Sequence, residues 1–264
     1  MNYMQVVDRF YNKSPKVREL LMRLIYGSKD ISIDLCGVKT EINTMKENGY
    51  LRASNLSLKS SLLRDEIPIF LSLSMILSKG DSFVDVGANI GIFSSIIARY
   101  KPFLSLEGVY AFEANPDTFE RLEKNSKSYG FTPYNIGISD REGELEFVAG
   151  AVSHVFTTVD NASKYNIESR STMIQCQRLD YFDIKGDSIV LKIDVEGQEL
   201  KILEGARSLF DNQRIKAVYL DGFANHKECL NFLTQYGFLL FDGKTLTESD
   251  GNLFSLLAVA GKEF

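Results

Sequence analysis

The stretch DSFVDVGANIGIFS (residues 81–94) joins an apolar run to a glycine turn and then to a second apolar run. The first run, 82–86, is rich in β-formers, and the second is typical of a helix that begins near Asn89. In an α/β sheet, such a strand–turn–helix unit places its turn beside the ligand crevice, at the carboxyl ends of the strands. The sequence therefore predicts an α/β fold with a binding site at this turn.

The spacing of the turn is Asp-x-Gly-x-x-x-Gly, through Asp85, Gly87 and Gly91. Gly87 would let the backbone approach a ligand and Gly91 would let the helix pack closely, while the helix N-terminus suits a carboxylate. A dinucleotide turn has its second glycine two residues after the first, where this chain has Asn89. Asp85 would repel a diphosphate but could orient an ammonium group. This spacing argues against the alternative, a nicotinamide-dependent Rossmann oxidoreductase.

Strand and helix patterns alternate from this unit to the end of the chain, which predicts a mainly parallel sheet with helices on both faces. We expect one Rossmann-like domain over 81–264, with a hairpin inserted near 143–179. The expected strands are 82–86, 108–113, 132–138, 188–194, 216–221, 238–241 and 253–260, and the expected helices include 115–129, 198–210 and 225–236.

Residues 1–80 differ from this pattern, and we expect a helical and β extension that caps the site, contacts the acceptor or joins a homo-oligomer. Apolar residues recur at helical spacing on both sides of Pro15. The longest apolar run, 67–77, is shorter than the roughly 20 residues of a membrane span, so we expect a buried helix or strand and no membrane span.

Composition narrows the class of partner. The formal net charge is −5, so the chain has no global basic field for a nucleic acid, and we expect none as a partner. The three cysteines lack C-x-x-C spacing and the N-terminus lacks a signal-peptide pattern. We therefore expect reduced thiols and a cytoplasmic protein.

Glu113 ends the expected strand 108–113, 26 residues after Gly87. An acid at about this interval, at the end of the second strand, accepts hydrogen bonds from a ribose diol in nucleotide-binding sheets. A solvated acid at a strand end is the alternative for Glu113 taken alone. Together with the glycine turn, Glu113 favours the ribose clamp.

The segment SIVLKIDVEGQELKILEGA (188–206) carries Lys192, Asp194 and Glu196 at alternate positions where an apolar strand ends. Alternation places all three on one face, and burying them is costly unless they pair or do chemistry. The alternative is a Lys192–Asp194 ion pair that stabilises the strand end, with Glu196 exposed.

The motifs VDVGANIGIFS, FEANP, NIGISDREG, RLD and LKIDVEGQELKILEGA, in this order and spacing, resemble the FkbM family of methyltransferases over about residues 80–220. The resemblance implies a class I methyltransferase sheet of seven strands with an antiparallel last strand. It also implies O-methylation of a sugar, nucleotide sugar, glycan or similar small metabolite. The S-adenosylmethionine would be held by Asp85, Gly87, Asn89 and Gly91, by Glu113 on the ribose, and by the turn with Asn135 and Ser139 beside the adenine.

Methyl transfer to a hydroxyl also requires removal of a proton, by a base or through a metal. Asp194 and Asp221 end adjacent expected strands, where they could share a Mg²⁺ with the acceptor oxygen, or one could act as the base. Histidine exchanges protons near neutral pH, so His226 is a second candidate base, with a surface position in a first helical turn as its alternative. We expect Lys192, Asp194, Glu196 and His226 to be the catalytic residues.

One observation qualifies the catalytic assignment. The segment YLDGFANH (219–226) departs from the Glu and nearby His that the family leads us to expect. A catalytically inactive nucleotide-binding scaffold of the same fold therefore stays open as a further alternative. We expect His154, in a polar insertion, to be a loop residue.

Overall fold

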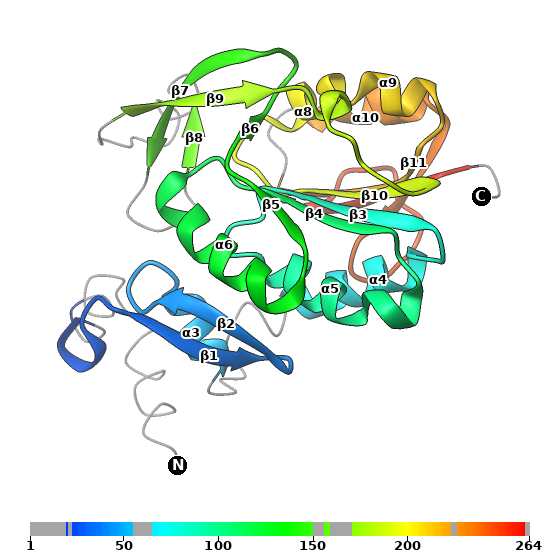
Figure 1. The fold of residues 1–264 in the computed structure, drawn as a ribbon. Coiled ribbons are helices and arrows are strands. Elements are labelled where there is room, and N and C mark those ends of the chain that lie inside the picture. Colours follow the sequence, from blue (N-terminus) through cyan, green and yellow to red (C-terminus); the bar gives the residue numbers. More distant parts are fainter. Residues whose placement is uncertain are drawn as a thin grey trace.

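The computed structural model describes residue 20 and residues 23–54, 65–149, 156–158, 171–222 and 226–261. Its centre is a seven-stranded sheet in the order β12-β13-β11-β10-β3-β4-β5 (Figure 1). Neighbouring strands from β11 to β5 are parallel, and β13 runs antiparallel to both β11 and β12. The predicted α/β class, the seven strands and the antiparallel last strand are confirmed. The strands are β3 (Asp81–Val86), β4 (Gly108–Phe112), β5 (Thr132–Tyr134), β10 (Ser188–Ile193), β11 (Ile215–Asp221), β12 (Phe238–Asp242) and β13 (Ser255–Ala260).

Helices cover both faces of the sheet, as Figure 1 shows. Each face has its own apolar core, because strands buried on both sides, such as β10, send side chains alternately to the two layers. No helix within the described ranges is both long and apolar enough to cross a membrane. One face carries α4 (Ile67–Ile76), α5 (Ile92–Leu104) and α6 (Pro116–Tyr129), and the other carries α8 (Glu199–Gly205), α9 (Arg207–Asp211) and α10 (His226–Gln235).

Local capping explains where α6 begins and ends. The Asn115 side chain accepts a hydrogen bond from the Asp117 N–H at 3.1 Å, and Pro116 occupies the first turn. Gly130 follows the helix with a left-handed φ of 75°. The predicted helix 115–129 is confirmed to within one residue.

Three predicted boundaries were wrong. Helix α5 begins at Ile92 and not near Asn89, because Asn89 and Gly91 adopt left-handed φ angles of 53° and 80° that extend the turn. The predicted helix 198–210 is interrupted at Ala206 into α8 and α9. The predicted strand 132–138 divides between two sheets, with β5 in the central sheet and β6 (Gly137–Ile138) in the other.

That other sheet contains the predicted insertion. Strands β7 (Gly143–Ala149) and β9 (Ser171–Gln177) pair antiparallel, as expected for a hairpin. Strands β6 and β8 (Phe156–Thr158) enlarge it to four strands in the order β6-β9-β7-β8. His154 lies outside the described residues.

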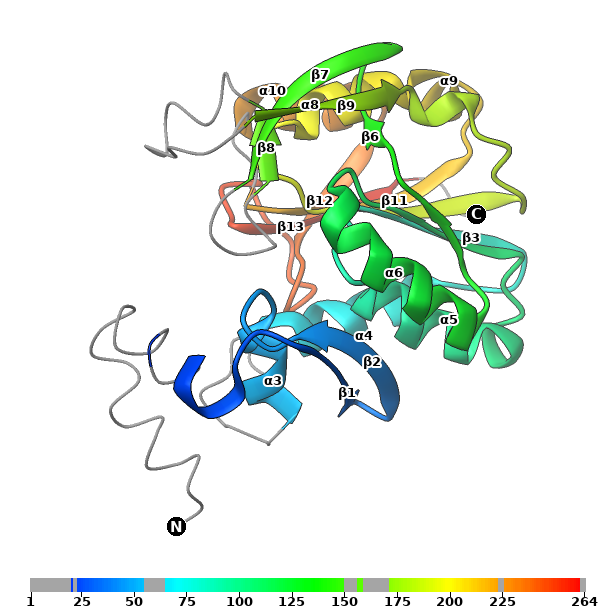
Figure 2. The same cartoon turned by 60° about the vertical axis from the view of Figure 1, so that its left-hand side comes forward.

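The chain before residue 80 adds a second hairpin, β1 (Asp30–Leu35) and β2 (Val38–Asn43), and helix α3 (Asn48–Ser54). Figures 1 and 2 both show these elements beside α5 and α6. Buried side chains of the hairpin, such as Val38 and Ile42, share one core with Ile92 and Ile96 of α5. The helical pattern expected before residue 20 lies outside the described residues.

Candidate functional site

A cavity of about 440 Å³ opens at the carboxyl ends of the central parallel strands. The predicted glycine turn lines it through Gly87, Ala88 and Asn89, and Glu113 lines it from the end of β4. Residues 136–138 border it from the link between β5 and β6, and residues 46–50 border it from the N-terminal elements. The predicted turn and the predicted clamp therefore share one cavity.

Glu113 is fixed in this cavity by two backbone groups. Its Oε1 accepts the Asn115 N–H and its Oε2 accepts the Asn89 N–H, each at 2.8 Å. Burial raises the pKa of Glu113 to about 7, against the opposite effect of these two hydrogen bonds. Each carboxylate oxygen has a further lone pair, so the side chain is oriented to accept two more hydroxyl groups.

Gly87 and Gly91 are required for packing at two different contacts. A Cβ at Gly87 would lie 2.0 Å from the backbone oxygen of Asp194, so this glycine lets the turn lie against the end of β10. A Cβ at Gly91 would lie 2.5 Å from Leu122 Cδ1, so α5 packs closely on α6, as predicted. Gly91 does not line the cavity. Asn89 does line it, and its Oδ1 is buried without a hydrogen-bond partner among the described residues.

Asp85 does not reach the cavity. It is 1% exposed, with its Oδ1 3.1 Å from Lys192 Nζ and its Oδ2 accepting a hydrogen bond from Ser94 Oγ at 2.8 Å. The expected contact between Asp85 and a ligand ammonium group is thus replaced by an internal ion pair. Burial lowers the pKa of Lys192, but the charges of Asp194 and Asp85 outweigh it and hold that pKa above its ordinary value.

The carboxylates at the ends of β10 and β11 face the same cavity, as predicted. Lys192 Nζ lies 3.2 Å from Asp194 Oδ2, so the ion pair that we weighed as an alternative is present, although Asp194 stays 48% exposed. The Tyr219 hydroxyl donates to Asp221 Oδ1 at 2.7 Å. Burial, followed by the charge of Asp194, raises the pKa values of both Glu196 and Asp221.

These groups do not fit a metal ion. The described part of the chain contains no group of three or more His, Cys, Asp or Glu side chains arranged to hold one. Asp194 and Asp221 also accept hydrogen bonds, from Lys192 and Tyr219 respectively. A Mg²⁺ needs several oxygen ligands in near-octahedral geometry, which Asp194 and Asp221, the predicted metal ligands, do not supply.

A second cavity of about 350 Å³ adjoins the first. Because both cavities are bordered by Lys192, Asp194 and Asp221, they meet at the ends of β10 and β11. Glu66, directly before α4, also lines both and was missed by the sequence analysis, since no motif marks it and only the fold brings it here. The second cavity is lined by Asp65, Glu66, Ile69, Phe93, Lys192, Asp194, Tyr219, Asp221, Lys244 and Phe254.

Besides Asp85 and Gly91, three further predicted residues lie outside both cavities. The Asn135 amide donates to the Glu113 backbone oxygen at 2.9 Å and so braces the loop after β4. Ser139 is buried and donates to Asp140 Oδ1 at 3.0 Å. His226 is the first residue of α10 and borders neither cavity. The turn 135–140 therefore contributes to the cavity through Ile136, Gly137 and Ile138, and not through Asn135 and Ser139.

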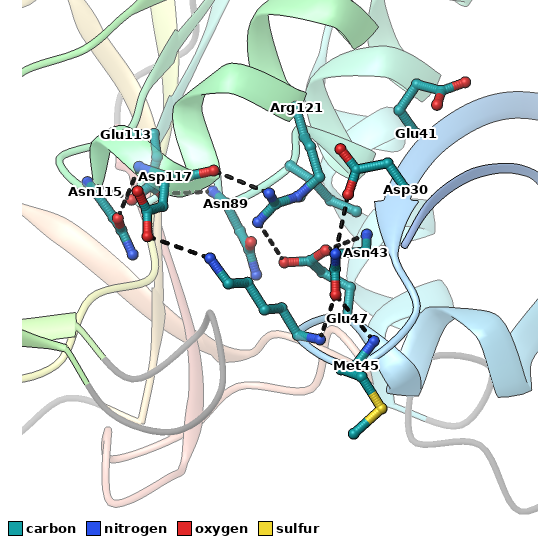
Figure 3. A network of polar contacts seen from close by, with 12 residues as sticks. Asp30, Glu41, Asn43, Met45, Glu47, Asn89, Glu113, Asn115, Asp117 and Arg121 are labelled. Carbon is teal, nitrogen blue, oxygen red and sulfur yellow. Dashed lines mark hydrogen bonds and ion pairs between the residues drawn. The ribbon is translucent and has the colours of Figure 1, made fainter. Parts of the chain in front are cut away.

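A buried ion pair holds in place the wall of the first cavity that residues 46–50 form (Figure 3). Arg121 on α6 donates to Glu47 Oε1 at 2.8 Å, and these side chains are 5% and 0% exposed. The other oxygen of Glu47 accepts the Asn43 N–H at 2.6 Å. Because Glu47 also lines the cavity, the segment that follows β2 is part of the site.

Known proteins that resemble this chain are found by family model, by sequence and by structure. The methyltransferase FkbM domain model matches residues 85–240. The hexuronic acid methyltransferase AglP of Haloferax volcanii is 27% identical over 185 residues, which cover 66% of this chain and 70% of that protein. Among solved structures, methyltransferase FkbM from Methylobacillus flagellatus KT is 14% identical with a TM-score of 0.43, covering 80% of this chain and 65% of that one.

A second solved structure is the tRNA (uracil-54, C5)-methyltransferase of Pyrococcus abyssi in complex with S-adenosyl-L-homocysteine. It is 12% identical with a TM-score of 0.44, and the match covers 89% of this chain and 44% of that one. The domain match spans more than half of the 264 residues, from Asp85 at the glycine turn to Leu240 in β12. This chain belongs to the FkbM family of methyltransferases.

Proposed function

We propose that this methyltransferase uses S-adenosylmethionine to methylate a hydroxyl group of a sugar or sugar-like acceptor. The observation that carries the proposal is the pair of cavities that meet at Asp194 and Lys192. One cavity has a clamp for a diol, and the other has polar walls suited to an acceptor. A methyl donor and an acceptor must meet in this way for an in-line transfer.

The first cavity suits the methyl donor. Glu113 has lone pairs for both ribose hydroxyls, and the unpartnered Asn89 Oδ1 is an acceptor for the ammonium group, in place of Asp85. Ile136 and Ile138 offer apolar contacts to the adenine. The carboxylates of Asp194 and Glu196 favour the positive sulfonium electrostatically. When bound, this cofactor supplies an activated methyl group.

The second cavity suits a hydroxylated acceptor. Asp65 and Lys244, paired at 3.1 Å, offer hydrogen-bond acceptors and donors on its wall, and Phe254 offers an apolar face. The relative AglP acts on a hexuronic acid, which supports a sugar-type acceptor here. Asp194, partly exposed where the two cavities meet, offers a hydrogen-bond acceptor to a further hydroxyl group of the sugar, next to the one that is methylated.

The test is transfer of an isotope-labelled methyl group from S-adenosylmethionine to a panel of monosaccharides, nucleotide sugars, uronic acids and other hydroxylated metabolites. We expect a labelled product in which nuclear magnetic resonance places the methyl group on oxygen. A label on nitrogen or carbon would contradict O-methylation. Tight cofactor binding without transfer to any acceptor would favour the inactive scaffold.

A further inference from the structure

Glu66 occupies the place where the two cavities meet, on a segment far in sequence from the methyltransferase motifs. It directly precedes α4 and lines both cavities. Its Oε2 is buried and has no hydrogen-bond partner among the described residues. A buried carboxylate oxygen without a partner is costly, so its presence at this junction points to a hydrogen-bonding ligand.

The neighbouring carboxylates differ from Glu66 in this respect. Asp194 accepts a hydrogen bond from Lys192, and Asp221 accepts one from Tyr219. Burial and, after it, the charge of Asp194 raise the pKa of Glu66 to about 8, against the opposing charge of Lys192. The other groups that interact electrostatically with Glu66 are Asp221 from β11, the adjacent Asp65, Tyr50 from α3 and Cys36 from the turn between β1 and β2.

We propose that Glu66 is the general base that takes the proton from the acceptor hydroxyl, an inference that rests on the proposed function. The O–H proton passes to Glu66 Oε2 while the hydroxyl oxygen forms a bond to the methyl carbon. The bond from that carbon to sulfur breaks, and its electron pair stays on sulfur to give neutral S-adenosylhomocysteine. The protonated Glu66 then returns its proton to water.

The pKa of Glu66 and its position both suit a general base. A base is most effective when its pKa lies near the working pH, and a carboxylate held near neutrality meets this condition. Glu66 also borders the donor cavity and the acceptor cavity together, as a base at the point of transfer must. His226, one of the candidate bases from the sequence, borders neither cavity.

The experiment compares Glu66→Gln with the unmodified protein. The variant keeps the size of the side chain and removes the proton acceptor, so we expect kcat to fall by about 10²–10⁴ while the affinity for S-adenosylhomocysteine changes less than twofold. Glu123→Gln, an exposed position on α6, is the matched control and should retain full turnover. Unchanged kcat in Glu66→Gln would overturn the proposal.

The pH profile gives a second readout that a purely structural role would not produce. We expect kcat/KM of the unmodified protein for the acceptor to rise with pH, to reach half of its plateau at about pH 8 and to level off above that, because only ionised Glu66 accepts the proton. Glu66→Asp should keep this rising limb at a lower rate, and Glu66→Gln should lose it. A flat profile in the unmodified protein would contradict the proposal even if Glu66→Gln failed to fold.

Failure of this inference differs from failure of the proposed function. If the unmodified protein transfers methyl groups to sugars and Glu66→Gln does so equally well, only the role of Glu66 is wrong. If the unmodified protein transfers no methyl group to any hydroxyl, the proposed function fails and the assignment of Glu66 fails with it.

Discussion

Lys192 Nζ lies 3.1 Å from Asp85 Oδ1, and the two residues are direct partners in the parallel pairing of β10 with β3. Parallel pairing sends the side chains of register partners to the same face of the sheet. Two buried charges 107 residues apart in sequence therefore neutralise one another beneath the cavity. The pair holds the glycine-turn strand against the strand that carries Asp194.

Replacement of Lys192 tests this relationship. Lys192→Met leaves Asp85 buried with a hydrogen bond from Ser94 Oγ at 2.8 Å but without its charged partner, so the free energy of unfolding should fall. The expected loss is about 3–5 kcal/mol, as for other buried pairs broken on one side. Urea unfolding measures it. The double variant Asp85→Asn/Lys192→Met should regain part of the loss, and equal stability of Lys192→Met and the unmodified protein would contradict the ion pair.

Gly87 and Gly130 have the same backbone φ in different surroundings, so their substitution separates backbone strain from close contact. Both have φ of 75°, but an added Cβ meets the Asp194 oxygen at 2.0 Å at Gly87 and nothing within 4 Å at Gly130. Gly130→Ala should cost about 1–2 kcal/mol from left-handed strain alone. Gly87→Ala should cost clearly more and weaken cofactor binding, because the turn must move away from β10. Thermal unfolding of both variants checks the difference, and equal costs would refute the close contact.

The link between α6 and the N-terminal hairpin predicts a coupled loss of stability and binding. Arg121→Met leaves the buried Glu47 carboxylate without its charged partner, so the free energy of unfolding should fall by about 3–5 kcal/mol. Cofactor affinity should fall as well, because residues 46–50 line the cavity. Lys127→Met, which breaks an exposed pair with Glu123 on the same helix, should cost only about 0.5 kcal/mol. Full cofactor affinity in Arg121→Met would show that the Arg121–Glu47 pair is not needed for binding.

The raised pKa of Glu113 predicts that cofactor binding depends on pH. Its pKa is about 7, so below pH 7 most of the free protein has a protonated Glu113. That proton must leave before the carboxylate accepts hydrogen bonds from the ribose. Affinity for S-adenosylhomocysteine should therefore weaken as the pH falls below 7, towards a limit of about tenfold per pH unit. Calorimetric titration at several pH values measures this slope. In Glu113→Gln the slope should disappear, and at pH 8 the affinity should be about 10- to 100-fold lower.

Much of the fold follows from the pattern of residues in the sequence. The apolar run, the glycine turn and the alternation after residue 81 indicated the parallel sheet, and Glu113 lines the cavity beside the glycine turn. The partner of Asp85 was not predictable, because it depends on the register of β3 with β10. Glu66 was missed for the same reason: it belongs to no motif, and the packing of α4 on the sheet brings it to the site.

The sequence also did not predict which motif residues form hydrogen bonds within the protein and do not line the cavity. Asn135 was expected beside the adenine, but its amide bonds to the Glu113 backbone. Ser139 was expected there too, and its hydroxyl bonds to Asp140. A sequence motif contains residues that face the cavity and residues that bond to neighbouring parts of the protein. Only the direction of each side chain in the structure distinguishes the two.

Binding of the methyl donor is the most direct test of the central claim that the 440 Å³ cavity holds S-adenosylmethionine. The measurement is thermal unfolding with S-adenosylmethionine, S-adenosylhomocysteine, NAD or NADP at a concentration of about 100 times Kd, which adds roughly 2.7 kcal/mol to the stability of a protein that binds. We predict a rise of several degrees in Tm with either sulfur nucleotide, since about 1 kcal/mol shifts the Tm of a domain this large by roughly 2–4 °C. A rise with NAD or NADP and none with either sulfur nucleotide would contradict the account and favour an oxidoreductase.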